Sequence, residues 1–181
     1  MKKPFMIKKS GIFVLLIFII IAFPVTYLIR ENTLNNSNKV NLHNLLMVYV
    51  ERVVDGDTII VNVTDNNFGL NTRERVRLIG VDTPETVHPT REEEPYGKEA
   101  SDFTKENLEG RYVYLDFDIE LRDRFGRVLA YVYTENGDHF NARLVKEGFG
   151  IAYLNYPFKY MDEFSRYESQ ARQKRLGLWG L

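Results

Sequence analysis

Residues 77–86 read Arg-Leu-Ile-Gly-Val-Asp-Thr-Pro-Glu-Thr and are the most informative stretch of the chain. The first half is rich in residues that favour β-strands. Pro84 ends the strand, because proline has no backbone N–H and a fixed φ. The run therefore brings a guanidinium (Arg77), a hard oxygen ligand (Asp82) and a carboxylate base (Glu85) to one place. This combination suits metal-assisted hydrolysis of a phosphodiester.

Two further segments give this run its context. Residues 54–59 read Val-Asp-Gly-Asp-Thr-Ile, and residues 123–131 read Asp-Arg-Phe-Gly-Arg-Val-Leu-Ala-Tyr. An isolated Asp-Gly-Asp often only marks a turn, but three such segments in order and at compatible spacing are specific. Together they resemble the thermonuclease (staphylococcal nuclease-like) family, over a region from about Val48 to the closing Leu-Gly-Leu-Trp at residues 176–179.

Periodicity predicts short strands and three helices. Alternating apolar residues favour strands at 48–54, 58–63, 73–81, 113–119 and 128–133. Helical spacing favours helices at 97–108, 141–147 and 163–174, the first two closed by Gly110 and Gly148. Residues 65–69 and 88–96 are expected to be loops. This pattern is typical of a small α+β barrel, and the resemblance implies a five-stranded OB-type barrel, a fold that commonly binds nucleic acid.

The composition limits the kinds of metal site. The chain of 181 residues has no cysteine, which excludes disulfides and thiolate ligands, and only three histidines. A metal is therefore expected to be bound by oxygen. Beyond residue 30 the chain has 19 basic against 25 acidic residues, a formal charge of −6. Because lysine and arginine drive non-specific affinity for polyanions, nucleic acid should bind weakly outside a locally positive cleft.

The N-terminal 30 residues differ from the rest. Residues 11–29 are apolar and uncharged, close to the roughly 20 residues needed to cross a bilayer, and four lysines precede them. We expect a membrane anchor with a cytoplasmic N-terminus and an extracytoplasmic domain. The alternative is a cleaved signal peptide and a secreted protein, although no Ala-x-Ala site follows. The polar residues 31–46 form a linker, and residues 47–181 form the thermonuclease-like domain.

The resemblance assigns the metal ligands. Asp57 and Asp82 each stand where a strand meets a turn, and two converging carboxylates can hold a hard cation. In the family, the matching aspartates bind Ca²⁺ with help from the backbone carbonyl at the position of Thr83. The alternative for an isolated aspartate is that it only caps a turn.

The catalytic residues follow from the same resemblance. Glu85 matches the proposed general base for the attacking water, a role that geometry must separate from merely positioning that water. Arg77 and Arg127 match the two arginines that stabilise charge on the phosphate, for which a planar guanidinium is well suited. The ordinary alternative for each arginine is a surface ion pair. Arg73, Arg75 and Arg122 lack a match and are expected to be solvated.

The substrate-binding residues match less completely. The family has a lysine and a tyrosine before the glycine of the third segment, where this chain has Arg124 and Phe125. Arginine keeps the charge, but phenylalanine has no hydroxyl. Tyr153 matches a tyrosine beside the nucleotide base, with a packed core aromatic as the alternative. The position of a second aromatic is taken by Asn155, with Tyr156 one residue later.

The expected function is a monomeric, membrane-tethered, Ca²⁺-dependent nuclease that hydrolyses DNA and RNA to 3′-phosphorylated products. The alternatives are a non-catalytic OB-type module that binds nucleic acid and a surface interaction domain. The presence of Asp57, Arg77, Asp82, Glu85 and Arg127 favours the enzyme.

Overall fold

The computed structural model describes residues 40–65, 68–86 and 94–181. Residues 41–181 form one compact unit. The predicted anchor at 11–29, most of the linker and the greater part of the predicted loop at 88–96 lie outside the described residues. Within the described parts, no helix combines the length and apolar character needed to span a bilayer.

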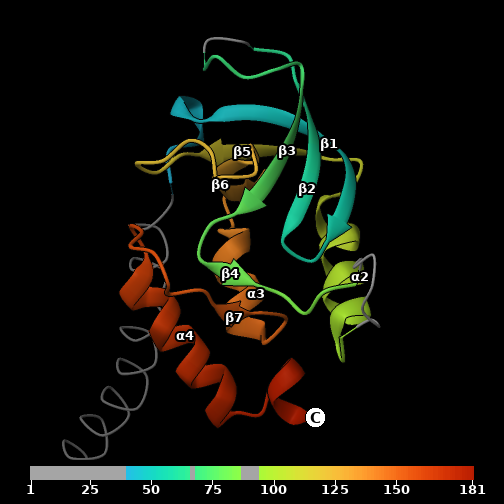
Figure 1. The fold of residues 1–181 in the computed structure, drawn as a ribbon, viewed down its shortest axis with the longest axis vertical. Helices are drawn as coiled ribbons and strands as arrows, with labels where there is room; N and C mark the ends of the chain where they lie inside the picture. Colours follow the sequence, from blue (N-terminus) through green and yellow to red (C-terminus); the bar gives the residue numbers. More distant parts are fainter. Residues whose placement is uncertain (1–39, 66–67, 87–93) are drawn as a thin grey trace, which may run out of the picture. The chain divides into compact units, whose positions relative to one another are not determined.

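Five strands close into the predicted barrel (Figure 1). They are β1 (Leu46–Asp55), β2 (Thr58–Val63), β3 (Arg73–Leu78), β5 (Tyr112–Asp116) and β6 (Val128–Thr134). Irregularities after Val50 and Val53 bend β1, whose first half pairs with both β2 and β5. The parallel pairing of β3 with β6 closes the barrel between Val76 and Val128. Both valines are fully buried in its interior.

The predicted strand at 73–81 is confirmed over residues 73–78 and wrong in its last third. β3 ends at Leu78, and β4 (Val81–Asp82) belongs to a separate two-stranded sheet with β7 (Ile151–Ala152), a strand that the sequence did not predict. Gly80 lies between them with φ +77°, a conformation that side chains rarely adopt. The chain therefore turns at Gly80, and Asp82 leaves the barrel wall.

The three predicted helices are confirmed as α2 (Gly97–Leu108), α3 (Phe140–Glu147) and α4 (Met161–Gln173). Two short 3-10 helices, η1 (Leu42–Asn44) and η2 (Gly177–Gly180), were not predicted. Figure 1 shows α3, α4 and the β4–β7 pair below the barrel, with α2 beside β1 and β2. Phe140, Leu144 and Phe164 carry the barrel core into this helical layer. The predicted strand at 113–119 ends early, at Asp116, and Ile119 is almost fully exposed.

Candidate active site

Asp57 is the centre of the site and lies in the turn between β1 and β2. It is only 2% exposed. Its carboxylate accepts hydrogen bonds from Thr58 Oγ1 (3.0 Å to Oδ1) and from the backbone N–H of Thr83 (2.9 Å to Oδ2). Thr104 Oγ1, on α2, donates to the Gly56 carbonyl (2.7 Å) and holds the turn from behind. These contacts join the turn to the segment after β4 and fix the carboxylate in place.

Arg77 connects the two predicted metal ligands. It pairs with Thr58 across β2 and β3, and its side chain is only 16% exposed. Nη1 forms an ion pair with Asp57, and Nη2 donates to Asp82 Oδ1 (2.6 Å) and to the Val81 carbonyl (3.1 Å). Asp57 and Asp82 therefore meet at the guanidinium of Arg77, as the sequence predicted for these three residues.

The oxygen atoms around Arg77 also fit a hard cation. Asp57 and Asp82 already direct carboxylate oxygens at one positive group. Thr83 lies beside them, and its buried Oγ1 has no hydrogen-bond partner among the described residues. Those residues contain no group of three or more His, Asp or Glu side chains able to hold a metal, so backbone carbonyls and water would have to complete the shell. Ca²⁺ accepts such a mixed oxygen shell.

Asp55 is a buried carboxyl that the sequence did not single out. Its Oδ1 accepts the backbone N–H of Asp57 (3.2 Å). Burial raises its pKa, against the opposing effects of Arg77, a hydrogen bond from Thr58, Arg75 and Arg127. Three guanidinium groups thus act on one buried carboxyl, which places Arg75 and Arg127 within electrostatic reach of the Asp57 turn.

Glu85 is half-buried in the segment that follows β4. Its backbone is held from both sides by Glu94: its N–H donates to Glu94 Oε2 (3.1 Å), and its carbonyl accepts the Glu94 N–H (3.0 Å). Gly97 begins α2 against it, so close that a Cβ there would lie 3.0 Å from the Glu85 carbonyl oxygen. The start of α2 and the residues before it therefore hold the backbone of the predicted base in place, three residues along the chain from Asp82.

Arg127 lies next to β3 because the following residue, Val128, pairs with Val76. Its Nε donates to Asp123 Oδ2 (2.6 Å), and its backbone N–H donates to Asp123 Oδ1 (3.0 Å). Burial alone would raise the pKa of Asp123, but these bonds and one from the Phe125 N–H outweigh it and lower the pKa. Asp123 was not predicted as a site residue, although an aspartate four positions before an arginine in a turn is a recognisable signal.

The predicted substrate residues lie at the edge of the site. Phe125 is 68% exposed, and the guanidinium of Arg124 lies 4.7 Å from its ring centre. The backbone N–H of Tyr153 donates to the Gly80 carbonyl (2.9 Å), and its half-buried ring lies 6.1 Å from that of Tyr156. Asn155 is exposed. Tyr153 is therefore not a fully packed core aromatic.

Arg73 and Arg122 were expected to be solvated, and each forms an ion pair. The Arg73 side chain remains 54% exposed to solvent, whereas that of Arg122 is only 32% exposed. Arg122 binds the buried Glu74 through both terminal nitrogens (2.5 and 3.0 Å), and Arg73 binds Glu51 (2.7 Å). In each case the acid is distant in sequence, so only the barrel brings the pair together.

Comparison with known proteins now identifies the family. A family model described as staphylococcal nuclease homologue matches residues 75–180. The thermonuclease of Staphylococcus intermedius is 46% identical over 132 residues, which is 72% of this chain and 74% of that protein. The thermonuclease of Staphylococcus hyicus is 44% identical over 131 residues (72% and 73%). Endonuclease YncB of Bacillus subtilis is 38% identical over 142 residues (77% and 64%). The chain belongs to the staphylococcal nuclease family.

Proposed function

We propose that this protein is a Ca²⁺-dependent endonuclease that hydrolyses DNA and RNA to 3′-phosphorylated products. The observation that carries the proposal is the meeting of Asp57, Asp82 and Arg77 at one point, with Arg127 directly before the neighbouring strand β6. A binding module would need the positive charge but not two carboxylates in the same place, because carboxylates repel phosphate.

Each residue has a role that its chemistry suits. Glu85 accepts a proton from the attacking water, whose oxygen bonds to phosphorus while the 5′-oxygen leaves. Arg77 and Arg127 bind the non-bridging oxygens, on which negative charge grows. Arg77 uses Nη1 and Nη2 on neighbouring oxygens, but a guanidinium carries five N–H donors, so donors remain for phosphate.

The cation would be held by Asp57, Asp82 and the backbone carbonyl of Thr83, as the family resemblance implies. When bound there, Ca²⁺ supplies positive charge to the phosphate and a hard site for water. Because Mg²⁺ demands tighter octahedral geometry at shorter distances, it should replace Ca²⁺ poorly.

Location forms part of the proposal. We place the domain outside the cytoplasmic membrane, tethered through residues 11–29, as a monomer. If the anchor is not cleaved, the protein stays with membranes after a high-salt wash and keeps its N-terminal residues. An N-terminus near residue 30 and recovery from the medium would instead establish the secreted form.

The decisive experiment uses the full chain in mild detergent with labelled single-stranded DNA and RNA. We expect cleavage with Ca²⁺, little with Mg²⁺ and none with chelator, and the products should carry 3′-phosphate. Full cleavage in excess chelator would contradict the metal-dependent mechanism. Folded protein that cleaves no nucleic acid under any of these conditions would favour a binding module.

A further inference from the structure

The outer side of the barrel is apolar where β1 pairs with β5. Met47 lies opposite Tyr114 and Tyr49 lies opposite Tyr112, while the residues between them point inward and are buried. Met47, Tyr49 and Tyr112 are 36–48% exposed, and Tyr114 is half-buried. The rings of Tyr49 and Tyr112 meet edge to face, with 5.4 Å between their centres. These four side chains, the apolar face, therefore form one surface and are not scattered exposed residues.

The apolar face carries no charge of its own. The two stretches that pair there, residues 46–49 and 112–115, consist only of apolar residues and tyrosine. Beyond its two ends stand acids that are each neutralised by a base, Glu51 by Arg73 and Asp116 by Lys159. A contiguous exposed apolar surface with a polar border is typical of a site that contacts another protein or a membrane.

The apolar face begins where the chain enters the domain. Met47 is the second residue of β1, and residues 30–45 separate that strand from the apolar segment 11–29 that we place in the membrane. Even fully extended, these sixteen residues span at most about 58 Å. A tether of this length holds the domain beside the bilayer at an effective concentration on the order of millimolar. A contact too weak to join separate molecules is therefore populated at the membrane surface.

The side chains of the apolar face suit the boundary between lipid and water. Three of the four are tyrosines, whose apolar ring and polar hydroxyl favour the level of the lipid headgroups. The fourth, Met47, has a flexible side chain that adapts to an irregular surface. A second copy of the chain is a less suitable partner, because the formal charge of −6 beyond residue 30 makes copies repel one another.

We propose that the apolar face rests on the lipid–water boundary of the membrane to which the domain is tethered. The tyrosine rings enter the boundary, and their hydroxyl groups stay with headgroups and water. This inference rests on the location given under the proposed function, and it adds the orientation in which the tethered domain is held.

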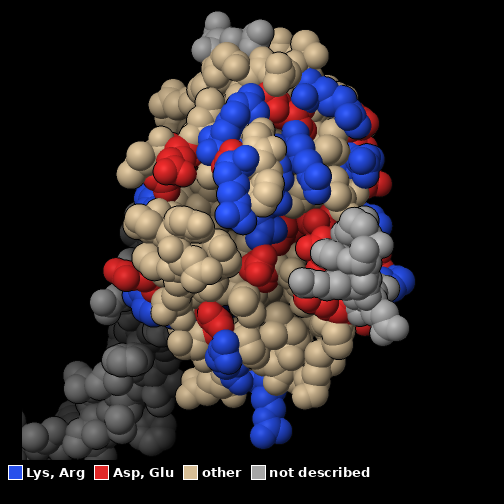
Figure 2. Space-filling view, in the orientation of Figure 1, with Lys and Arg blue, Asp and Glu red and all other residues tan. Residues whose placement is uncertain are grey.

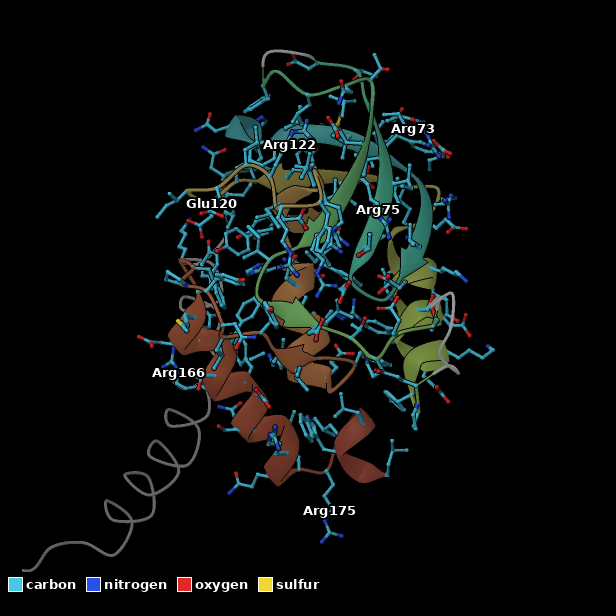
Figure 3. The ribbon with its side chains drawn as sticks, viewed as in Figure 1. Arg73, Arg75, Glu120, Arg122, Arg166 and Arg175 are labelled. Atoms are coloured by element: carbon cyan, nitrogen blue, oxygen red, sulfur yellow. The ribbon has the colours of Figure 1, made fainter. Side chains whose placement is uncertain are left out.

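Docking through β1 and β5 turns the active site away from the membrane. The strands follow one another around the barrel in the order β1-β2-β3-β6-β5, so β3 is the barrel strand that pairs with neither β1 nor β5. β3 carries Arg77 of the site as well as Arg73 and Arg75, which Figure 3 labels. Figure 2 shows Lys and Arg side chains gathered on the face where Figure 1 places β2 and β3. The arginines are thus kept from lipid phosphates, which would compete with a nucleic acid for them.

The full chain, reconstituted into phosphatidylcholine vesicles, tests the contact. Because the chain has no cysteine, an environment-sensitive dye can be attached to a single introduced cysteine. Tyr112→Cys puts the dye in the apolar face. Arg75→Cys is the matched control, because it puts the dye at an exposed position of a barrel strand that does not pair with β1 or β5. Emission is measured with and without lipid that carries a spin label near the headgroup, which quenches a dye at the boundary.

We expect the dye at Tyr112→Cys to emit at shorter wavelength and to be quenched several-fold more than the dye at Arg75→Cys. Low and high salt should give the same result, because salt screens charges and not apolar contacts. Adding Tyr49→Glu should remove most of the quenching at Tyr112→Cys, since a charged side chain resists leaving water. Tyr49→Phe keeps the ring and should preserve it. Equal quenching at the two dye positions overturns the docking.

A second copy of the chain on the apolar face would give a different result. The dye at Tyr112→Cys would then emit at shorter wavelength without being quenched by lipid, and the shift would disappear when the protein is diluted with excess lipid. That outcome also overturns the docking, because it makes the apolar face an interface between copies.

Two further measurements on the same vesicles separate this inference from the proposed function. Chain that a high-salt wash removes from the vesicles overturns the anchor and the docking together. Retained chain with an unquenched dye at Tyr112→Cys overturns the docking and leaves the anchor. Cleavage of labelled DNA with Ca²⁺ should be the same for the parent and Tyr49→Glu, because the active site lies across the barrel. Chain that docks but cleaves nothing removes the nuclease and leaves the membrane contact.

Discussion

Replacing Asp123 by asparagine should separate the orientation of Arg127 from the fold of its turn. Asp123 Oδ1 accepts the backbone N–H groups of Phe125 and Arg127, and Oδ2 accepts Arg127 Nε at 2.6 Å. Asparagine keeps one oxygen for the two backbone donors. Its NH₂ group, however, faces the Nε–H, donor against donor. The turn should persist while the guanidinium loses its partner.

The size of the effect follows from the exposure of the pair. The two side chains are 25% and 16% exposed, so solvent screens their interaction only in part. A hydrogen bond to a charged group contributes about 1.5–3 kcal/mol, and we expect the free energy of unfolding to fall by about 1–2 kcal/mol. A displacement of a catalytic group by about 1 Å can cost about 100-fold in rate. Turnover should therefore fall about 10- to 100-fold, with a smaller change in KM.

Urea unfolding and steady-state kinetics on the full chain measure the two effects. Glu51→Gln is the control, because it removes a comparable contact to Arg73 (2.7 Å) on an exposed surface. Such pairs contribute about 0–1 kcal/mol, and turnover should not change. If Asp123→Asn loses stability but keeps parental turnover, Asp123 only holds the turn, and the argument that it positions Arg127 is wrong.

Three other substitutions test separate parts of the structure. Arg127→Lys keeps the charge but loses the planar fork, so steady-state kinetics should show lower turnover, equivalent to an activation free energy higher by about 2.7–4 kcal/mol. Arg124→Lys should mainly raise KM. Near-normal turnover of folded Arg127→Lys would show that Arg127 is only a surface charge. Gly56→Ala would place a Cβ 2.7 Å from Thr83 Oγ1, so urea unfolding should show a loss of about 1–3 kcal/mol and kinetics a loss of turnover. Burial, together with the charge of Lys159, lowers the pKa of His139 from 6.5 to about 3. As the pH falls below 6.5, the unfolded chain therefore takes up a proton at His139 that the folded protein does not. The free energy of unfolding should then fall by up to about 1.4 kcal/mol per pH unit between pH 6.5 and about 3. His139→Phe should lose that part of the pH dependence, and unchanged dependence would contradict the assignment.

Much of the site was predictable from sequence because its residues are local. Asp57, Arg77 and Asp82 stand at the ends of strands whose alternation is readable, and short turns fix where those ends lie. The five strands and three helices followed from the same periodicity. The spacing of the three segments identified the family before any contact was known.

The tertiary structure decided what depends on distant residues. The break at Gly80 was missed because residues 78–81 contain no polar side chain that would mark a turn. The chain turns there because Gly80 has a positive φ, and the ring of Phe158 lies so close that a side chain would not fit. The pairing of Glu74 with Arg122 joins residues 48 apart. Periodicity describes a residue's neighbours along the chain, whereas a closed barrel sets charges beside one another across strands. For that reason the sequence by itself determined which groups the candidate site contains, and only the barrel decided which arginines have an acidic partner, such as Arg73, Arg77 and Arg122, and which, like Arg75, have none among the described residues.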